Sequence, residues 1–403
     1  MKLLFLISLI LNYFNLYIFT PKTELGKILF TIVYHFIFFI IPYALSFDPK
    51  QFNNRYSIIF SYSFLLSTSL IVLSSWIFLL TNISIFYLKI LYMLISSVPI
   101  IFLKNETFFL RLKLLLTHSK SLIVYFYLAI VIKYFFLIYS QPILMYDSAN
   151  AYYPSAISFI NSQSFYSDVG IQRVGVLAPP LIPFLISFSF LISKSVSFNL
   201  SINFINYLTS YIFFIGMTLL SYIADKKVKH SDGFVFILLF PILTYSALLI
   251  TDIINVIYFM SFIILSYDIQ KFSNINNKIS SVIFIYLLIC ITSFTIRSTL
   301  GVIIFGLAIL NILIIVITAR NIILYKNISF VLILMAPVLT ILSYFIFEYQ
   351  TFLTYQKFGG VLGDNLTQFL ISLQNRHYVI NFEYYINALY ILMGFPIIYF
   401  GSI

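Results

Sequence analysis

Long apolar runs, separated by short polar or charged segments, recur along the whole sequence. Most runs hold about 17 to 25 residues, the length that an α-helix needs to cross a hydrocarbon layer of about 30 Å. Because lipid offers no partners to backbone N–H and C=O groups, such runs predict helices. We expect an all-α polytopic membrane protein with about twelve transmembrane helices. Their expected positions are 3–19, 26–45, 57–80, 83–103, 121–139, 200–224, 233–250, 253–269, 279–296, 302–318, 328–347 and 384–400.

One further apolar run, at residues 179–193, differs from the others. It opens with Pro179-Pro180 and holds about fifteen residues, which is short for a membrane span. We therefore expect a re-entrant or interfacial helix there. A full crossing would also move Lys226, Lys227 and Lys229 to the opposite side of the membrane, against the positive-inside rule.

Without that crossing, the basic residues outside the spans divide unequally between the two sides of the membrane, while Lys89 and Lys133 lie within spans. Fourteen fall on one side, namely Lys2, Lys50, Arg55, Lys104, Arg111, Lys113, Lys120, Lys226, Lys227, Lys229, Lys271, Lys278, Arg320 and Lys326. Seven fall on the other side, namely Lys22, Lys27, Arg173, Lys194, Arg297, Lys357 and Arg376. Cytoplasmic loops carry the excess of Lys and Arg, so we expect a multi-pass protein of the cell membrane with both termini in the cytoplasm.

Composition narrows the classes of function. Of the 403 residues, 62% are hydrophobic and 9% are charged, which excludes a soluble enzyme. The net charge of +11 fits cytoplasmic loops and lipid headgroups better than nucleic acid. Cys290 is the one cysteine of the sequence, so the chain by itself forms neither a disulfide framework nor a thiolate metal site.

The predicted spans divide the chain into three parts. Residues 1–120 form an N-terminal membrane extension of four helices, and residues 121–318 a membrane core with an outer loop at 140–178. Residues 319–403 hold the C-terminal helices and a second outer loop at 348–382. Polar backbone can meet water in these two loops, so functional residues are expected there first.

Few carboxylates are present, and several fall on the predicted outer side. Asp147 follows a span directly and lies among aromatic and small residues, so a functional and a boundary role are equally open. Asp252 lies in a two-residue turn, where a helix N-cap is the simpler role. Arg297 lies in another short outer turn and can either snorkel to headgroups or bind a phosphate. Arg173 is the one basic residue of the first long loop, and an ordinary solvated arginine is its alternative role.

Four sequence elements in this region occur in the order and spacing of a known family. They are an acid followed by aromatic residues and an alanine, a Pro-Pro-Leu segment, a hydroxyl residue before a helix-opening aspartate, and an arginine between hydroxyl residues. The positions are Asp147, Tyr152, Tyr153 and Ala156; Pro179, Pro180 and Leu181; Pro241, Ser246, Thr251 and Asp252; and Arg297. This pattern resembles the GT-C superfamily of membrane glycosyltransferases, which includes protein O-mannosyltransferases, aminoarabinose transferases and oligosaccharyltransferase catalytic subunits.

The resemblance covers residues 121–318 and implies a GT-C-like catalytic core. It implies an inverting hexosyl- or pentosyltransferase that moves a sugar from a polyprenyl-phosphate donor to a glycan, lipid or protein acceptor at the outer face. Asp147 would be the general base, with Asp252 as the second catalytic residue. The implied substrate-binding residues are Tyr152, Tyr153, Asp168, Arg173 and Arg297.

No metal ligand or other cofactor is assigned. The first loop of the family often carries paired acids, whereas here Asp147 is followed by Ser148. A divalent cation, Mg²⁺ or Mn²⁺, would need Asp147 and Asp252 to converge on it.

Two other classes of function remain open. Twelve helices with both ends inside also suit a transporter or flippase for a lipid-linked glycan, although the interior helices lack the Gly- and Pro-broken pairs of many such proteins. A glycan polymerase or ligase uses the same lipid-linked substrates. It would depend on the later outer loop with Lys357 and Arg376 rather than on Asp147.

Overall fold

The computed structural model describes residues 2–47, 56–81, 83–101, 111–113, 117, 152–162, 181–205, 207–208, 250–272, 280–296, 298–318 and 328–358. Within these ranges every regular element is a helix, and no strand occurs. The predicted spans at 121–139 and 384–400, most of 200–224 and nearly all of 233–250 lie outside them. The number of about twelve spans therefore stays a prediction.

The first four predicted spans are helical, and each ends within two residues of its expected position. The second span is a continuous helix of three parts, since π-helical turns separate α2 from α3. Pro42 follows those turns. It has no N–H to donate to the carbonyl one helical turn earlier, which explains why the helix widens there. The elements are α1 (Lys2–Tyr13), η1 (Phe14–Ile18), α2 (Glu24–Tyr34), η2 (His35–Ile40), α3 (Ile41–Ser46), α4 (Tyr56–Thr81) and α5 (Ile85–Ile101).

The later helices agree with the predicted runs, with two differences. A helix, α7, lies within the predicted first outer loop, and α15 continues eleven residues beyond the predicted span that ends at 347. The apolar-run criterion detects contact with lipid and so misses helices that extend into polar sequence. The elements are α7 (Tyr153–Ser162), α9 (Leu181–Ser193), α12 (Ile250–Phe272), α13 (Ser280–Ile296), α14 (Ser298–Thr318) and α15 (Ile328–Phe358).

Among the described helices, three are long and apolar enough to cross a membrane: Glu24–Ser46, Ile58–Thr81 and Leu300–Ile317. A fourth candidate is a bent pair, in which Leu181–Ser193 is followed by Phe198–Ile205 at an angle of 119°. The apolar stretches of the other described helices are shorter, namely Phe5–Ile18, Ile85–Ile100, Tyr258–Ile269, Val282–Ile296 and Phe330–Ile346. This architecture fits an α-helical membrane protein.

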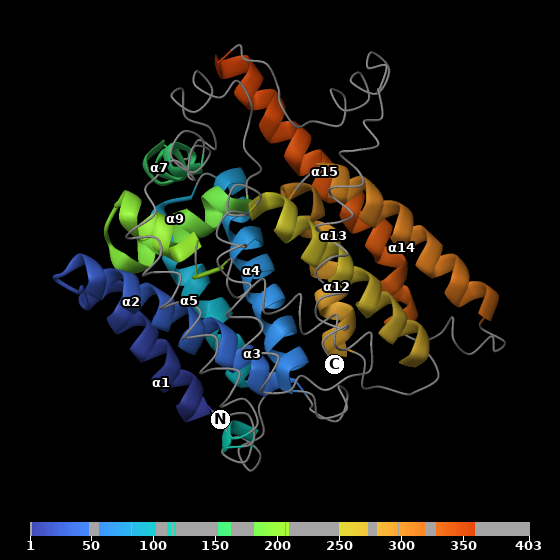
Figure 1. Cartoon of the computed structure of the whole chain (residues 1–403), viewed down its shortest axis with the longest axis horizontal. Helices are drawn as coiled ribbons and strands as arrows, with labels where there is room; N and C mark the ends of the chain where they lie inside the picture. The colour runs from blue at the N-terminus through green and yellow to red at the C-terminus, as the bar shows by residue number, and fades with distance from the viewer. Residues whose placement is uncertain are drawn as a thin grey trace, which may run out of the picture.

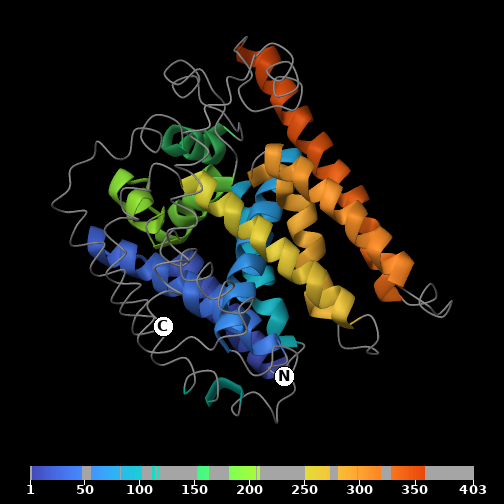
Figure 2. The same cartoon turned by 45° about the vertical axis from the view of Figure 1, so that its right-hand side comes forward.

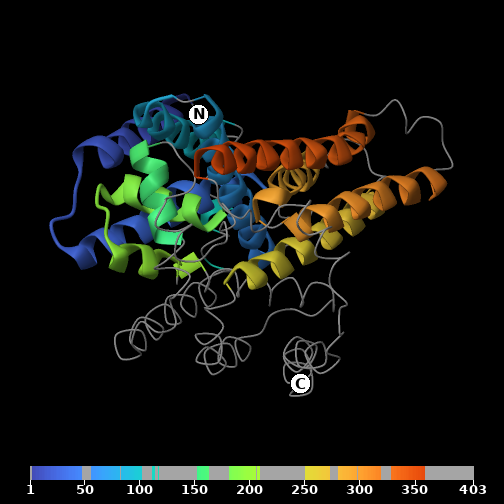
Figure 3. The ribbon, with the colours of Figure 1, turned by 90° about the horizontal axis from the view of Figure 1, so that it is seen from above.

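The helices form two groups that meet at α4. The blue and green elements, α1 to α9, lie on one side, and the yellow to red elements, α12 to α15, lie on the other (Figures 1 and 2). Seen from above, the two groups lie next to each other (Figure 3). Helix α4 packs against α9 in the first group and against α13 in the second. One continuous core of buried apolar side chains includes residues from both groups.

Helix α9 lies inside this bundle. All thirteen of its side chains are buried, and it packs against α2, α4 and α7. Full burial among other helices argues against a helix that lies on the membrane surface. The 119° bend after Ser193 fits either a broken span or a re-entrant loop, so the re-entrant assignment stays a prediction.

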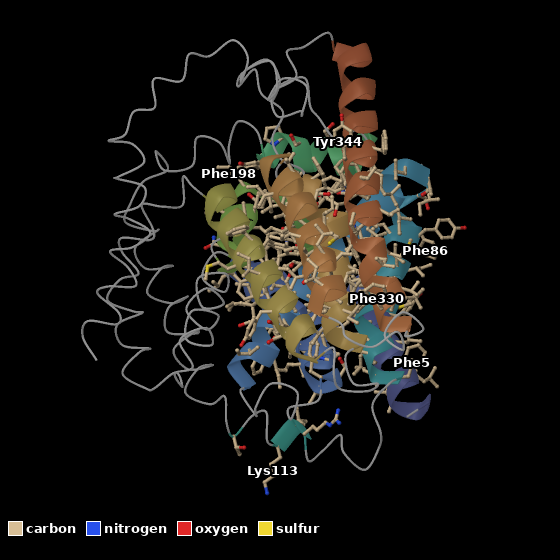
Figure 4. All side chains as sticks on the ribbon, turned by 90° about the vertical axis from the view of Figure 1, so that its right-hand side faces the viewer. Phe5, Phe86, Lys113, Phe198, Phe330 and Tyr344 are labelled. Carbon is tan, nitrogen blue, oxygen red and sulfur yellow. The ribbon has the colours of Figure 1, made fainter. Side chains whose placement is uncertain are left out.

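Contacts between turns define the two ends of the first group. The turn after α9 contacts the turn before α2, because Lys194 Nζ donates to Phe19 O over 2.9 Å. At the opposite end, Arg111 donates to Leu45 O over 3.2 Å. The positive-inside division assigned Lys194 to one side, and Arg111 to the other. Figure 4 shows Phe86, Phe198 and Tyr344 above Phe5, Phe330 and Lys113 along this axis. We call the end with Phe19 and Lys194 the predicted outer end.

Candidate functional site

Two of the four family-like elements pack against each other. Helix α7 carries the aromatic residues and alanine of the first element, and α9 begins at Leu181 of the Pro-Pro-Leu segment. Ser187 Oγ of α9 donates to Ala156 O over 3.2 Å, and the rings of Phe159 and Phe184 lie 5.0 Å apart. Ala156 is fully buried, so its small side chain allows the two helices to approach closely. Helix α7, the described part of the predicted first outer loop, is thus anchored on α9.

The two tyrosines predicted to bind substrate lie at the start of α7. Tyr152 is buried, and Tyr153 is half-buried. The Tyr153 ring contacts Phe190 of α9 and Phe198 of the next helix edge to face, at 5.9 and 5.2 Å. These contacts give Tyr153 a packing role at the α9 bend. Stacking of a sugar on either tyrosine stays a prediction.

Trp76, the single tryptophan of the chain, joins α9 to the element that precedes Arg297. Its indole N–H donates to Thr295 Oγ1 of α13 over 2.7 Å. Its ring meets Phe184 of α9 edge to face at 5.4 Å. Trp76 is 3% exposed, so both contacts are shielded from solvent. One side chain of α4 therefore holds α9 and the end of α13 in a fixed relation.

The other two family-like elements lie on neighbouring helices. Asp252 is the third residue of α12, and Arg297 lies between the end of α13 and the start of α14. Helices α12 and α13 pack together, and α12 also contacts α14. Since α12 and α13 are consecutive helices of the bundle, the first turn of α12 and the last turn of α13 lie at the same end (Figure 1).

Four of the predicted site residues, Asp147, Asp168, Arg173 and Arg297, lie outside the described residues. Asp252 is described only as part of the α12 backbone. The relation between Asp147 and Asp252, and hence a shared divalent cation, stays a prediction. Among the described residues no group of three His, Cys, Asp or Glu side chains could hold a metal ion.

A basic cluster at the predicted outer end was not singled out from the sequence. The Nζ atoms of Lys194 and Lys27 donate to Phe19 O and Ser195 Oγ, at 2.9 and 3.2 Å. Lys89 Nζ lies 5.5 Å from the centroid of the Tyr17 ring. Partial burial and the charge of Lys89 both lower the pKa of Lys194. The sequence assigned Lys27 and Lys194 to the same predicted side, but Lys89 lies within a predicted span, so the linear pattern did not group the three lysines.

His35 is fully buried where α2 meets η2. Its Nδ1 lies 3.0 Å from the Tyr207 hydroxyl, which links this span to the helix that begins at Phe198. The rings of Phe188 and Phe204 approach it edge to face, at 5.8 and 5.9 Å. In the described part of the chain, His35 Nε2 has no hydrogen-bond partner. This apolar surrounding gives His35 a packing and linking role rather than a place in a proton relay.

The described geometry thus places α7, α9 and the end of α13 around the C-terminal half of α4. No protein-family model, curated protein or solved structure matches the chain.

Proposed function

We propose that the protein is a membrane glycosyltransferase that moves a sugar from a polyprenyl-phosphate donor to an acceptor hydroxyl at the outer face of the cell membrane. Both termini would lie in the cytoplasm. In this reaction the acceptor oxygen forms a bond to the anomeric carbon, the bond between that carbon and the phosphate oxygen breaks, and the phosphate leaves on the lipid.

The observation that carries the proposal is the position of Trp76 between two family-like elements. Its contacts with Phe184 and Thr295 connect the Pro-Pro-Leu helix to the residue two positions before Arg297. The first outer loop joins the same assembly through the bond from Ser187 to Ala156. Elements more than a hundred residues apart in the sequence are therefore held together by buried contacts, as a shared site requires.

The chemistry assigns distinct roles to the charged residues. The acceptor hydroxyl must lose its proton as it attacks, so a carboxylate within hydrogen-bond reach is needed, and Asp147 is our choice. The departing phosphate gains negative charge, which Arg297, with Arg173 as the second candidate, would stabilise through charge-assisted hydrogen bonds. Asp252 would orient the sugar or the acceptor.

The test is sugar transfer by the purified protein in lipid, from a panel of labelled polyprenyl-phosphate sugars. General-base catalysis contributes roughly 10²- to 10⁴-fold, so Asp147→Asn should lower the rate at least 100-fold. Asp364→Asn is the matched control, because Asp364 lies on the same predicted side but in the later outer loop, and its rate should stay within about twofold. Equal rates for the wild type and Asp147→Asn would refute the assignment of the base.

A second measurement separates the alternatives. If the donor crosses the bilayer without losing its sugar, the protein is a flippase. If Lys357 and Arg376, rather than Asp147, are required for product formation, it is a polymerase or ligase.

A further inference from the structure

We propose that Lys27, Lys89 and Lys194 form a binding site for the phosphate of a membrane lipid at the predicted outer end of the bundle. We call this set the lysine cluster. The inference is independent of the proposed transferase activity, because it concerns the lipid-facing side of α1, α2 and α5.

The three lysines are connected through a continuous set of neighbours. Lys89 lies over the Tyr17 ring, and two residues further along the chain Phe19 O accepts the hydrogen bond of Lys194. Lys27 donates to Ser195, the residue next to Lys194. Contacts among the turn before α2, α2 itself, α5 and the end of α9 therefore bring the three lysines into one neighbourhood.

The described part of the chain gives the cluster no ion pair. Glu24, three residues before Lys27 on α2, accepts a hydrogen bond of 2.7 Å from Ser197. None of the three lysines forms an ion pair with a described carboxylate. Lys89 and Lys194 are close enough for their charges to repel each other. An ammonium has three N–H donors, and the hydrogen bonds of Lys27 and Lys194 to Ser195 and Phe19 use one donor each, so donors remain for an anion.

The backbone of Lys194 holds its side chain at the end of α9. Lys194 has a φ of 53°, in the left-handed region. Ser195 N donates to Phe190 O over 3.3 Å, which completes the helix-ending motif that usually holds glycine at this position. A glycine would adopt this conformation without steric cost, whereas a residue with a side chain is strained there. What the lysine adds to this motif is an ammonium group, which reaches Phe19 O.

An exposed apolar surface lies next to the lysine cluster. Phe86 and Tyr87, at the start of α5, are 53% and 56% exposed, and Tyr13 of α1 is 50% exposed. The Phe86 ring lies 5.7 Å from the ring of Tyr17, which Lys89 contacts. Exposed aromatic side chains beside lysines match a lipid, whose acyl chains contact the apolar surface while its phosphate contacts the ammonium groups.

The experiment uses the full chain, delipidated in detergent, and native mass spectrometry with phosphatidylglycerol as the probe. A basic residue at a membrane surface contributes about 1 kcal/mol to the binding of anionic lipid, which corresponds to roughly fivefold in affinity. Lys27→Gln, Lys89→Gln and Lys194→Gln should each weaken binding about fivefold. Lys22→Gln is the matched control. Lys22 is exposed at the same end, and this substitution removes the same charge, so it should change lipid binding less than twofold.

Two ligand controls identify the chemistry. Dioleoylglycerol, which lacks phosphate, should not compete with phosphatidylglycerol, and inorganic phosphate should displace little of it. Displacement by inorganic phosphate alone would show a free-phosphate site and overturn the lipid assignment. Equal effects of Lys22→Gln and the three cluster substitutions would show non-specific attraction and would also overturn it, as would a wild-type protein that does not retain the lipid.

Lys194→Gly separates binding from folding. Since glycine removes the backbone strain, this variant should be at least as thermally stable as the wild type, yet bind phosphatidylglycerol about fivefold more weakly. Unchanged lipid binding by a stable Lys194→Gly protein would contradict the proposal, and it cannot be explained by misfolding.

Discussion

The hydrogen bond between Trp76 and Thr295 links α4 to α13, and its strength can be predicted from the structure. Both side chains are almost fully buried, with 3% and 1% exposed. Thr295→Val keeps the side-chain shape but leaves the buried indole N–H without its acceptor, which costs about 1–3 kcal/mol. Trp76→Phe removes the donor together with part of the ring that contacts Phe184, and truncation of a core side chain of this size costs about 2 kcal/mol.

The energy of the bond itself comes from the double-mutant cycle. Because hydrogen bonds between membrane helices average about 0.6 kcal/mol and reach about 1.7 kcal/mol, we expect a coupling free energy between these values. Unfolding in mixed micelles by increasing SDS gives the free energies, followed by circular dichroism. As Trp76 is the single tryptophan, its fluorescence reports the same transition in the wild type and in Thr295→Val.

A matched cycle tests whether the coupling is specific. Thr340 is also buried, but its hydroxyl bonds to Ala336 O of its own helix, so Trp76→Phe and Thr340→Val should be additive. A coupling within error of zero for Trp76 and Thr295 would refute the link between α4 and α13. Equal coupling in both cycles would show a general loss of packing instead.

Two further substitutions test the packing. Asn12→Ala removes hydrogen bonds to Ser96 and Ser97 of α5 and the one from Tyr34 of α2, and should lower the free energy of unfolding by about 2 kcal/mol in the same SDS titration. The control, Asn203→Ala, removes a bond within its own helix and should change this free energy by less than about 0.5 kcal/mol. Gly301→Ala places a methyl group against the buried Phe294 ring and should lower the midpoint of thermal unfolding, at a cost of about 1–3 kcal/mol. Gly306 has open space around it, so Gly306→Ala should leave the midpoint unchanged or raise it. Equal midpoints for the two alanine variants would contradict the contact between residue 301 and Phe294.

The helices that contain apolar runs could be predicted closely from the sequence. The first four spans end within two residues of their expected positions, because an apolar run must be helical in lipid and a polar residue ends the run. The same criterion missed α7 and the last eleven residues of α15. Those segments are stabilised by helical hydrogen bonds and packing, such as the contact of Phe159 with Phe184, rather than by lipid.

The candidate site was harder to predict, because its parts come together only through contacts between distant segments. A linear pattern identified Asp252 and Tyr153 as separate elements but gave no sign that Trp76 would connect α9 to α13. It likewise gave no sign that Lys194 would meet Lys89. Pairing of this kind depends on the direction in which each helix faces its neighbours, and apolar helices with little amphipathic character do not reveal it.

The position of α4 explains what the N-terminal helices contribute. The division at residue 120 treats them as an extension of the membrane core, yet α4 packs against α9 on one side and α13 on the other. Its outer half supplies Trp76 to α9 and α13, and Phe78 to the Phe159 ring of α7 at 5.2 Å. Nearer the start of α4, the Thr68 hydroxyl lies 2.9 Å from the Tyr258 hydroxyl of α12. Helices α7, α9, α12 and α13, which carry the family-like residues or neighbour them, therefore all contact α4. We conclude that the N-terminal helices form the scaffold on which the candidate site is built.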